Sequence, residues 1–141
     1  MKCAKWILGL LVTIMPLLAT AQLQDKETIW AQVPFKFMVG SKTIPAGECV
    51  IKRAATDSKT LLINNASASV SLFSSVFPLE TKTISGNYIL IFHVYGERYF
   101  LTGLQLKGDR TIYQFPESKA EAEMRAQNLP VAEETLLASV K

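Results

Sequence analysis

The sequence predicts a mostly β protein, a small antiparallel β-sandwich or barrel with a short C-terminal helix. Apolar and polar residues alternate in short runs that recur about every ten residues, and turn-forming residues separate them. Residues 88–105 hold two such runs on either side of Gly96-Glu97, the pattern of a β-hairpin. After Pro116 the apolar spacing changes to that of a helix.

The chain begins with the features of a secretory signal peptide over 1–21. Lys2 and Lys5 make a short basic start, an apolar run covers 6–18, and small residues end at Ala21. A membrane anchor is the alternative, but the run is shorter than the roughly 20 apolar residues that span a bilayer. We therefore expect cleavage near Ala21, a secreted or periplasmic protein, and no transmembrane segment in the mature chain.

Cleavage would also change the charge of the chain. The full sequence has 15 basic and 12 acidic residues, and losing Lys2 and Lys5 leaves 13 basic residues, so the formal net charge falls from +3 to +1. The remaining basic residues are scattered and mostly adjoin acidic ones, unlike the clusters of nucleic-acid-binding proteins. Nucleic acid is therefore not an expected partner. The mature chain is long enough for one domain with its own core.

The first predicted strands lie close to the expected mature N-terminus. Residues 33–39 alternate in polarity, which predicts a half-buried strand with Pro34 at a sheet edge. Turn residues over 40–47 lead to a second strand at 48–53. This strand carries Cys49, the one cysteine left after cleavage. We expect a buried thiol, and a cross-link between two chains is the alternative.

The middle of the chain predicts two further extended segments. Residues 60–63 form a short apolar run, and Asn64-Asn65 is a turn pattern. A longer extended run covers 67–77, and Pro78 is predicted to end it.

The hairpin over 88–105 is the most specific prediction. Gly96 stands at the first central position of its turn, where a type II′ turn needs glycine. The register then pairs Tyr95 with Arg98, Val94 with Tyr99, His93 with Phe100, Phe92 with Leu101 and Leu90 with Gly103. Both faces are largely apolar, so we expect the hairpin to lie centrally and to be covered on each side. A last strand follows at 111–115.

The C-terminal residues 117–141 are predicted to form a helix and a tail outside the β domain of 22–116. Residues 132–140 are expected to be a further short helix or part of the tail.

The helix has a defined start in the sequence. Ser118 and Glu121 have the spacing of a capping box, in which Ser118 accepts from the backbone N–H of Glu121 and the Glu121 side chain reaches back. We expect the helix to run to about Gln127. Met124 is its one sizeable apolar residue, so it is predicted to lie on the surface or project from it.

Four segments of the chain, 33–40, 42–48, 95–101 and 116–121, are specific in combination. Together they resemble small secreted β-rich proteins of unknown function that are common in acidobacteria. The resemblance covers most of the mature chain and implies an exported bacterial domain that is rich in strands and ends in a charged helix. It implies no activity. Relatives have an aromatic residue at the position of Cys49, which favours a packing role for this thiol.

The sequence offers little for catalysis. His93 is the one histidine, and no acid can be assigned to orient it, so a hydrogen-bonded structural role is expected. Neither a Gly-x-Ser-x-Gly nor a Ser-x-x-Lys motif occurs, and one histidine with one thiol makes a poor metal-ligand set. We therefore expect no enzyme, no cofactor and no metal site.

The hairpin tip is one candidate binding surface. It carries Tyr95, Arg98 and Tyr99, and Arg98 is placed to stack on the Tyr95 ring. Exposed aromatics beside a charged group suit sugar rings, whereas the structural alternative is a cross-strand pair that stiffens the hairpin.

The helix is the second candidate surface, through Lys119, Glu121, Met124 and Arg125. A solvated charged helix is the structural alternative. These observations favour an exported non-catalytic β domain that serves in envelope structure or binds an envelope protein. A module that binds cell-wall polysaccharide through the hairpin tip is the alternative, and the sequence does not fix the oligomeric state.

Overall fold

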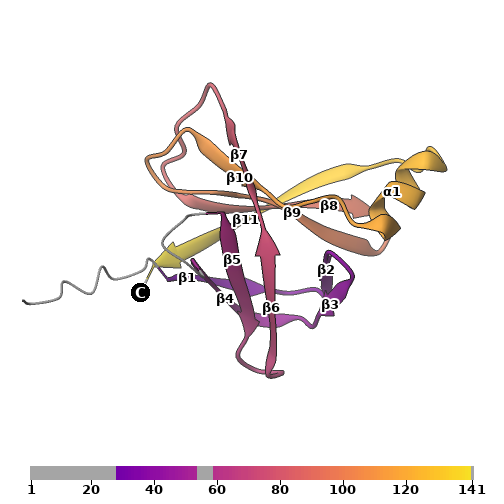
Figure 1. The fold of residues 1–141 in the computed structure, drawn as a ribbon, viewed down its shortest axis with the longest axis horizontal. Coiled ribbons are helices and arrows are strands. Elements are labelled where there is room, and N and C mark those ends of the chain that lie inside the picture. Colours follow the sequence, from indigo (N-terminus) through magenta and orange to yellow (C-terminus); the bar gives the residue numbers. More distant parts are fainter. Residues whose placement is uncertain (1–27, 54–58, 141) are drawn as a thin grey trace, which may run out of the picture.

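The computed structural model describes residues 28–53 and 59–140, which form a nearly closed, barrel-like sheet with one short helix near the C-terminal end (Figure 1). The predicted fold class is confirmed in its barrel form. The expected signal peptide lies outside the described residues. Within the described ranges, no helix is long and apolar enough to cross a membrane.

The strands form one sheet that curves until it is nearly closed. The eleven strands are β1 (Ile29–Val33), β2 (Phe37–Val39), β3 (Lys42–Ile44), β4 (Gly47–Arg53), β5 (Thr60–Asn65), β6 (Val70–Ser75), β7 (Phe77–Glu80), β8 (Tyr88–Tyr95), β9 (Arg98–Gln105), β10 (Thr111–Gln114) and β11 (Ala132–Val140). Their order is β3-β2-β9-β8-β11-β1-β4-β5-β6. Beyond β6 the chain continues into β7, which pairs with β10, and β10 pairs with β9. The sheet is therefore nearly closed, but β6 itself pairs only with β5 and keeps one open edge.

The strand predicted at 33–39 is interrupted, and the strand before the interruption begins at Ile29, ahead of the predicted range. β1 ends at Val33 and β2 begins at Phe37, with Pro34 between them. Proline has no N–H for a ladder, so the chain leaves the β1 ladder there. β2 then pairs in parallel with β9 through Met38 and Phe100, which makes the sheet mixed rather than wholly antiparallel.

The turn predicted at Asn64-Asn65 instead follows these residues, because both belong to β5. Asn65 is fully buried, and its Oδ1 accepts hydrogen bonds from the backbone N–H groups of Ser67 (2.9 Å) and Ala68 (3.1 Å). Its Nδ2 donates to the carbonyl of Pro45 at 2.7 Å. Asn65 thus shapes the turn after β5 and ties it to the turn before β4.

The extended run predicted at 67–77 is also divided. β6 and β7 are separated by the buried Val76, and the prediction that Pro78 ends the run is wrong. Pro78 lies inside β7, opposite Tyr113 of β10. β7 is paired on one side only among the described strands, and an edge position tolerates proline.

The central hairpin has the predicted register next to its turn. Tyr95 faces Arg98, and the next three predicted pairs follow in step. Gly96 has φ +63°, as the first central residue of a type II′ turn requires. A bulge between Ile91 and Phe92 then shifts the register, so Gly103 faces Ile91 rather than the predicted Leu90. Periodicity cannot reveal an extra residue of this kind.

The predicted helix is α1 (Lys119–Ala126). Ser118 is its N-cap and accepts from the backbone N–H of Glu121 at 3.1 Å, as predicted. The reciprocal half of the capping box is absent, because the Glu121 side chain turns away from the cap and into the protein.

The tail or helix predicted at 132–140 is instead β11, a strand in the interior of the sheet. It pairs with β8 from Ala132 to Ala138 and with β1 at Ser139 and Val140. Residues 117–141 are therefore not an appendage to a complete β domain. Removing them would take away a strand that lies between two others.

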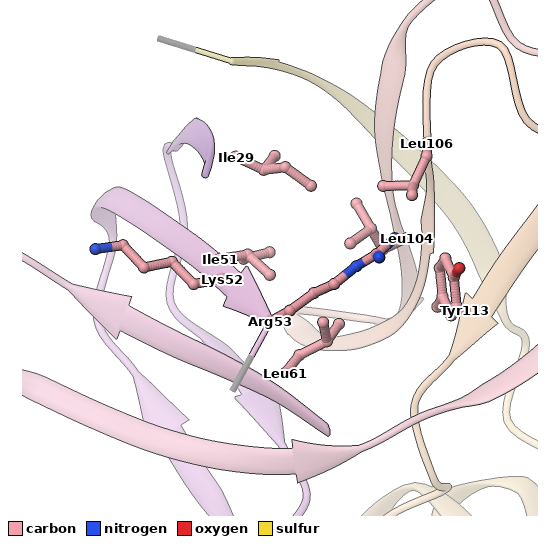
Figure 2. A pocket seen from close by; sticks show the side chains of 8 residues that line it. All are labelled: Ile29, Ile51, Lys52, Arg53, Leu61, Leu104, Leu106 and Tyr113. Atoms are coloured by element: carbon pink, nitrogen blue, oxygen red, sulfur yellow. The ribbon is translucent and has the colours of Figure 1, made fainter. Parts of the chain in front are cut away.

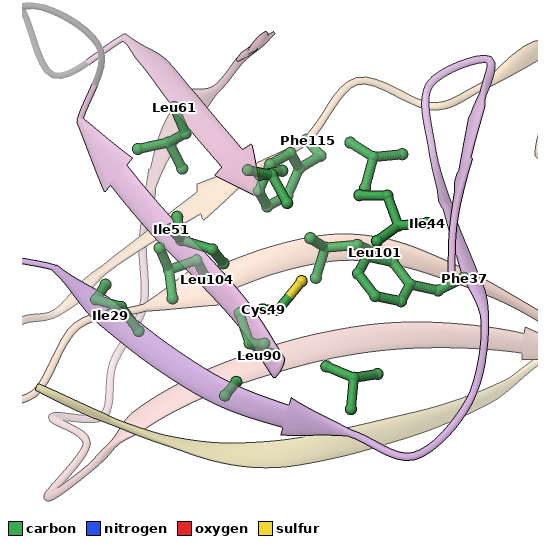
Figure 3. Close-up of a cluster of buried hydrophobic side chains, with 14 of the residues drawn as sticks. Ile29, Phe37, Ile44, Cys49, Ile51, Leu61, Leu90, Leu101, Leu104 and Phe115 are labelled. Atoms are coloured by element: carbon green, nitrogen blue, oxygen red, sulfur yellow. The ribbon is translucent and has the colours of Figure 1, made fainter. Parts of the chain in front are cut away.

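The core fills the space that the curved sheet encloses (Figure 3). Cys49 on β4 points into it and is almost fully buried, as predicted, and it forms no disulfide within the described residues. Burial raises the pKa of the thiol from 9.0 to about 11, because desolvation disfavours the thiolate. Cys49 therefore behaves as a small apolar side chain at neutral pH.

Candidate functional site

A cleft of about 600 Å³ lies where α1 meets the sheet. Its walls come from β7, β8, β9, β10, α1 and the segments that flank α1. The lining residues are Phe77, His93, Tyr95, Thr102, Gln114, Phe115, Pro116, Glu117, Glu121, Arg125 and Val131. Its volume is within the range of sites that hold small molecules or segments of a partner.

A hydrogen-bonded triad forms one wall of this cleft. Oε1 of Glu121 lies 2.7 Å from Nδ1 of His93, and it accepts a hydrogen bond from the Tyr95 hydroxyl at 3.2 Å. Glu121 is only 5% exposed, whereas the side chain of His93 is 37% exposed. The buried carboxylate therefore fixes the ring of a histidine that still reaches solvent.

Strand and helix geometry together place these three groups. His93 and Tyr95 are two residues apart on β8, so their side chains leave the same face of the sheet. Glu121 lies in the first turn of α1, which the Ser118 cap holds in place. Position 133 of β11 lies directly opposite His93 and carries the exposed Glu133, so a second carboxylate lies on the same face of the sheet, one strand away.

The hydroxyl groups that line the cleft are already engaged. The Tyr95 hydroxyl donates to Glu121, and Oγ1 of Thr102 donates to the carbonyl of Ile91 at 3.1 Å. Burial raises the pKa of Tyr95, and the negative charge of Glu121 raises it further. Tyr95 therefore stays protonated and acts as a donor. The arrangement suits orientation and binding better than nucleophilic attack.

The mouth of the cleft combines apolar and charged groups. Phe77 and Val131 are each more than half exposed, although both are apolar. Arg125 of α1 forms an exposed ion pair with Glu117, with Nη2 and Oε2 3.0 Å apart. Such a pair is worth little in water and exchanges readily for another partner.

The structure separates the residues predicted at the hairpin tip. Tyr95 is buried on the side of α1, whereas Tyr99 is half-buried on the other face and stacks on Phe35 with centroids 3.8 Å apart. The predicted stacking of Arg98 on Tyr95 is wrong, because the guanidinium lies over Phe100 at 5.6 Å from its centroid. The two tyrosines therefore form no common platform.

A smaller pocket of about 280 Å³ does remain at the tip. Arg98 and Tyr99 line it together with Glu97 of the turn, Met38 of β2 and Lys36 just before β2. Arg98 also donates to the Met38 sulfur at 3.5 Å.

The predicted helix surface is divided in a similar way. Lys119 and Arg125 are exposed and Met124 is half-buried, but Glu121 is buried against β8. Glu121 therefore belongs to the inner wall of the cleft and not to an outer surface of the helix.

A further, shallower pocket of about 460 Å³ lies between β1, β4 and β11 and is lined by Gln32, Val33, Pro34, Ala46, Gly47 and Leu136. A narrow gap near one end of the core has room for about 10 Å³ of solvent, and Arg53 reaches across it toward Leu104 and Tyr113 (Figure 2). This is about the space of one water molecule. No group of three His, Cys, Asp or Glu side chains that could hold a metal ion occurs among the described residues.

Sequence reasoning missed the partner of His93. Glu121 lies 28 residues away, and its spacing from Ser118 offered a complete local explanation in the capping box. The one signal was the helix itself, which has a single sizeable apolar residue and must be anchored by some other contact. Nothing in the sequence indicates that Phe77 and Val131 line the same cleft, because this depends on how the strands are arranged.

Searches of protein-family models, of curated proteins and of solved structures each found no match to this chain.

Proposed function

We propose that this chain is an exported, non-catalytic binding module that serves in the bacterial envelope and holds a segment of a partner protein in the cleft beneath α1. The observation that carries the proposal is the pair of exposed apolar side chains, Phe77 and Val131, at the mouth of a cleft with a rigid polar wall. Exposed apolar groups with a polar rim are typical of protein-binding sites.

The chemistry of the wall supports binding rather than turnover. Its hydroxyls donate to groups within the chain, and its carboxylate is occupied by His93 and Tyr95. The exposed part of the His93 ring and the guanidinium of Arg125 remain to meet a partner. An apolar side chain between Phe77 and Val131, with a carboxylate next to Arg125, would satisfy both parts of the site.

Site-specific photocrosslinking tests this assignment. A photoreactive phenylalanine analogue placed at Val131 should capture an envelope protein when the mature chain 22–141 is incubated with envelope extract. The same analogue at Leu137 is the matched control, because Leu137 is also apolar and more than half exposed but lies on β11 outside the cleft. Capture at both positions, or at neither, would contradict the proposal.

A substitution on the facing wall makes the test specific. Phe77→Ser should weaken capture at position 131 by at least about tenfold, because aromatic anchors dominate such interfaces. Leu137→Ser should leave capture unchanged. Circular dichroism of both variants checks that they fold.

Glycan binding is the second candidate, supported by the 280 Å³ pocket at the hairpin tip. In this form it depends on Arg98 and Tyr99 but not on Tyr95. Retention of the chain on cell-wall polysaccharide should fall in Arg98→Ala and persist in Arg110→Ala, which removes an exposed arginine elsewhere. Equal retention of the two variants would exclude this pocket.

A further inference from the structure

β6 is the edge strand at one end of the sheet. Over Val70–Ser75 it pairs with β5, and no other described strand pairs with it. In an antiparallel pair every second residue points its N–H and C=O away from the neighbour. The open side of β6 therefore presents a row of backbone donors and acceptors to any strand that approaches (Figure 1).

This edge lacks the usual protection against pairing. Residues 60–79 contain no Asp, Glu, Lys, Arg or His, and β6 itself contains no proline. The edge at the opposite end of the sheet is different, because β3 has only three residues and begins with Lys42. Natural sheets commonly blunt an edge with shortness, lysine or proline, and β6 has none of these features.

The outward face of β6 adds an apolar group to the open ladder. Leu72 points into the core, whereas Phe73 is 68% exposed and has Ser71 and Ser75 on either side. A large exposed ring between two small side chains leaves space for a second ring opposite it.

We infer that a second copy of this chain pairs with the β6 edge, antiparallel and about a two-fold axis, so that Phe73 of each copy lies opposite Phe73 of the other. An edge that meets its own copy closes into a dimer only in this antiparallel arrangement. Residues directly opposite must point to the same face, and centring the pair on Phe73 places Ser71 opposite Ser75. This register covers the most exposed side chain of the strand.

The absence of charge favours the second copy as the occupant. In this arrangement the residue on the two-fold axis faces its own copy and must therefore be uncharged, as Phe73 is. β6 and the adjoining β5 carry no charged side chain that would repel a second copy. A strand selected to bind a different partner would gain specificity from charged residues, which this edge does not offer. One strand pair is a small interface, so we expect a dissociation constant on the order of micromolar.

Sedimentation equilibrium of the mature chain 22–141 between about 1 and 200 μM tests the dimer over the range expected for such an interface. Phe73→Lys places two like charges opposite one another and removes the ring pair, and should raise the dissociation constant about tenfold or more. Leu137→Lys is the matched control, because Leu137 is also 68% exposed but lies on a strand paired on both sides. It should dimerise like the unmodified chain.

Two results would overturn the inference: an unmodified chain that is monomeric throughout, or a Phe73→Lys chain that dimerises as well as the control. Hydrogen exchange of the unmodified chain gives a second test that needs no variant. Amides within 70–75 should become protected as concentration rises through the dissociation constant. Protection that is already complete in the monomer would mean that the edge is covered from within the chain, and would also reject the second copy.

Discussion

Replacing Glu121 with alanine should destabilise the protein far more than a helix-surface substitution. The carboxylate accepts from His93 Nδ1 at 2.7 Å and from the Tyr95 hydroxyl at 3.2 Å. Glu121 is also the one buried residue of α1, so this contact anchors the helix to β8.

The magnitude follows from these two bonds. A hydrogen bond to a charged group contributes about 1.5–3 kcal/mol, and the lower end applies to His93 because its ring is partly solvated. Loss of the carboxylate also leaves the buried Tyr95 hydroxyl without an acceptor, at a cost of about 1–3 kcal/mol. We expect Glu121→Ala to lower the free energy of unfolding by about 3 kcal/mol and Tm by about 10 °C.

Urea denaturation followed by circular dichroism measures this change. Glu123→Ala is the control, because Glu123 is exposed on the same helix and its loss should change the free energy of unfolding by less than about 0.5 kcal/mol. Tyr95→Phe in the Glu121→Ala background should cost less than in the unmodified chain, since its acceptor is already gone. A loss below about 1 kcal/mol in Glu121→Ala would refute the view that this triad holds the helix.

Three further predictions concern the fold. Asn65→Ala removes the bonds to Pro45, Ser67 and Ala68 from a fully buried site and should cost about 3 kcal/mol in a thermal or urea melt; an unchanged melt would show that solvent replaces them. The Cys49 pKa is raised in the folded state, so its contribution to stability is complete below pH 9.0 and is lost as pH rises toward about 11; Cys49→Ala should flatten the fall in urea midpoint over that window, and an equal fall in both proteins would contradict this. Ending the chain at residue 131 removes β11 and should abolish the cooperative unfolding transition, whereas a truncated chain with a native spectrum would show that β8 and β1 need no strand between them.

The hairpin was predictable because its information is local. Gly96 sets the turn, the turn sets the register, and alternation assigns the faces as far as Phe92. Beyond that point a bulge moved the pairing by one residue. The position of a bulge depends on the curvature of the whole sheet, and a run of about ten residues carries no information on that curvature.

β11 was missed for a related reason. Its sequence over 132–140 has two adjacent glutamates followed by two adjacent leucines, so it lacks the strict alternation that identifies a half-buried strand. Its position comes from pairing with β8 and β1, and its side chains are mostly exposed. A strand that is held by backbone pairing alone needs no alternation of apolar and polar side chains, so its sequence does not identify it.

The candidate site was predictable only in its parts. His93, Tyr95 and Glu121 all drew attention in the sequence, but each had a sufficient local role on a strand, at a hairpin tip or in a helix cap. Their meeting depends on how α1 folds back across β8, and that is set by long-range packing rather than by spacing.

The pairing of β1 with β11 also determines when this protein can fold. Ile29 lies opposite Val140, so a strand from the start of the described chain finds its neighbour 111 residues later. The nearly closed sheet cannot form before this last strand has been synthesised. The sheet should therefore assemble only once the whole chain is available, at the slow rates typical of sheets built from distant segments. Until then the uncharged β6 edge has no folded sheet beside it, and this is when the chain is most exposed to aggregation through that edge.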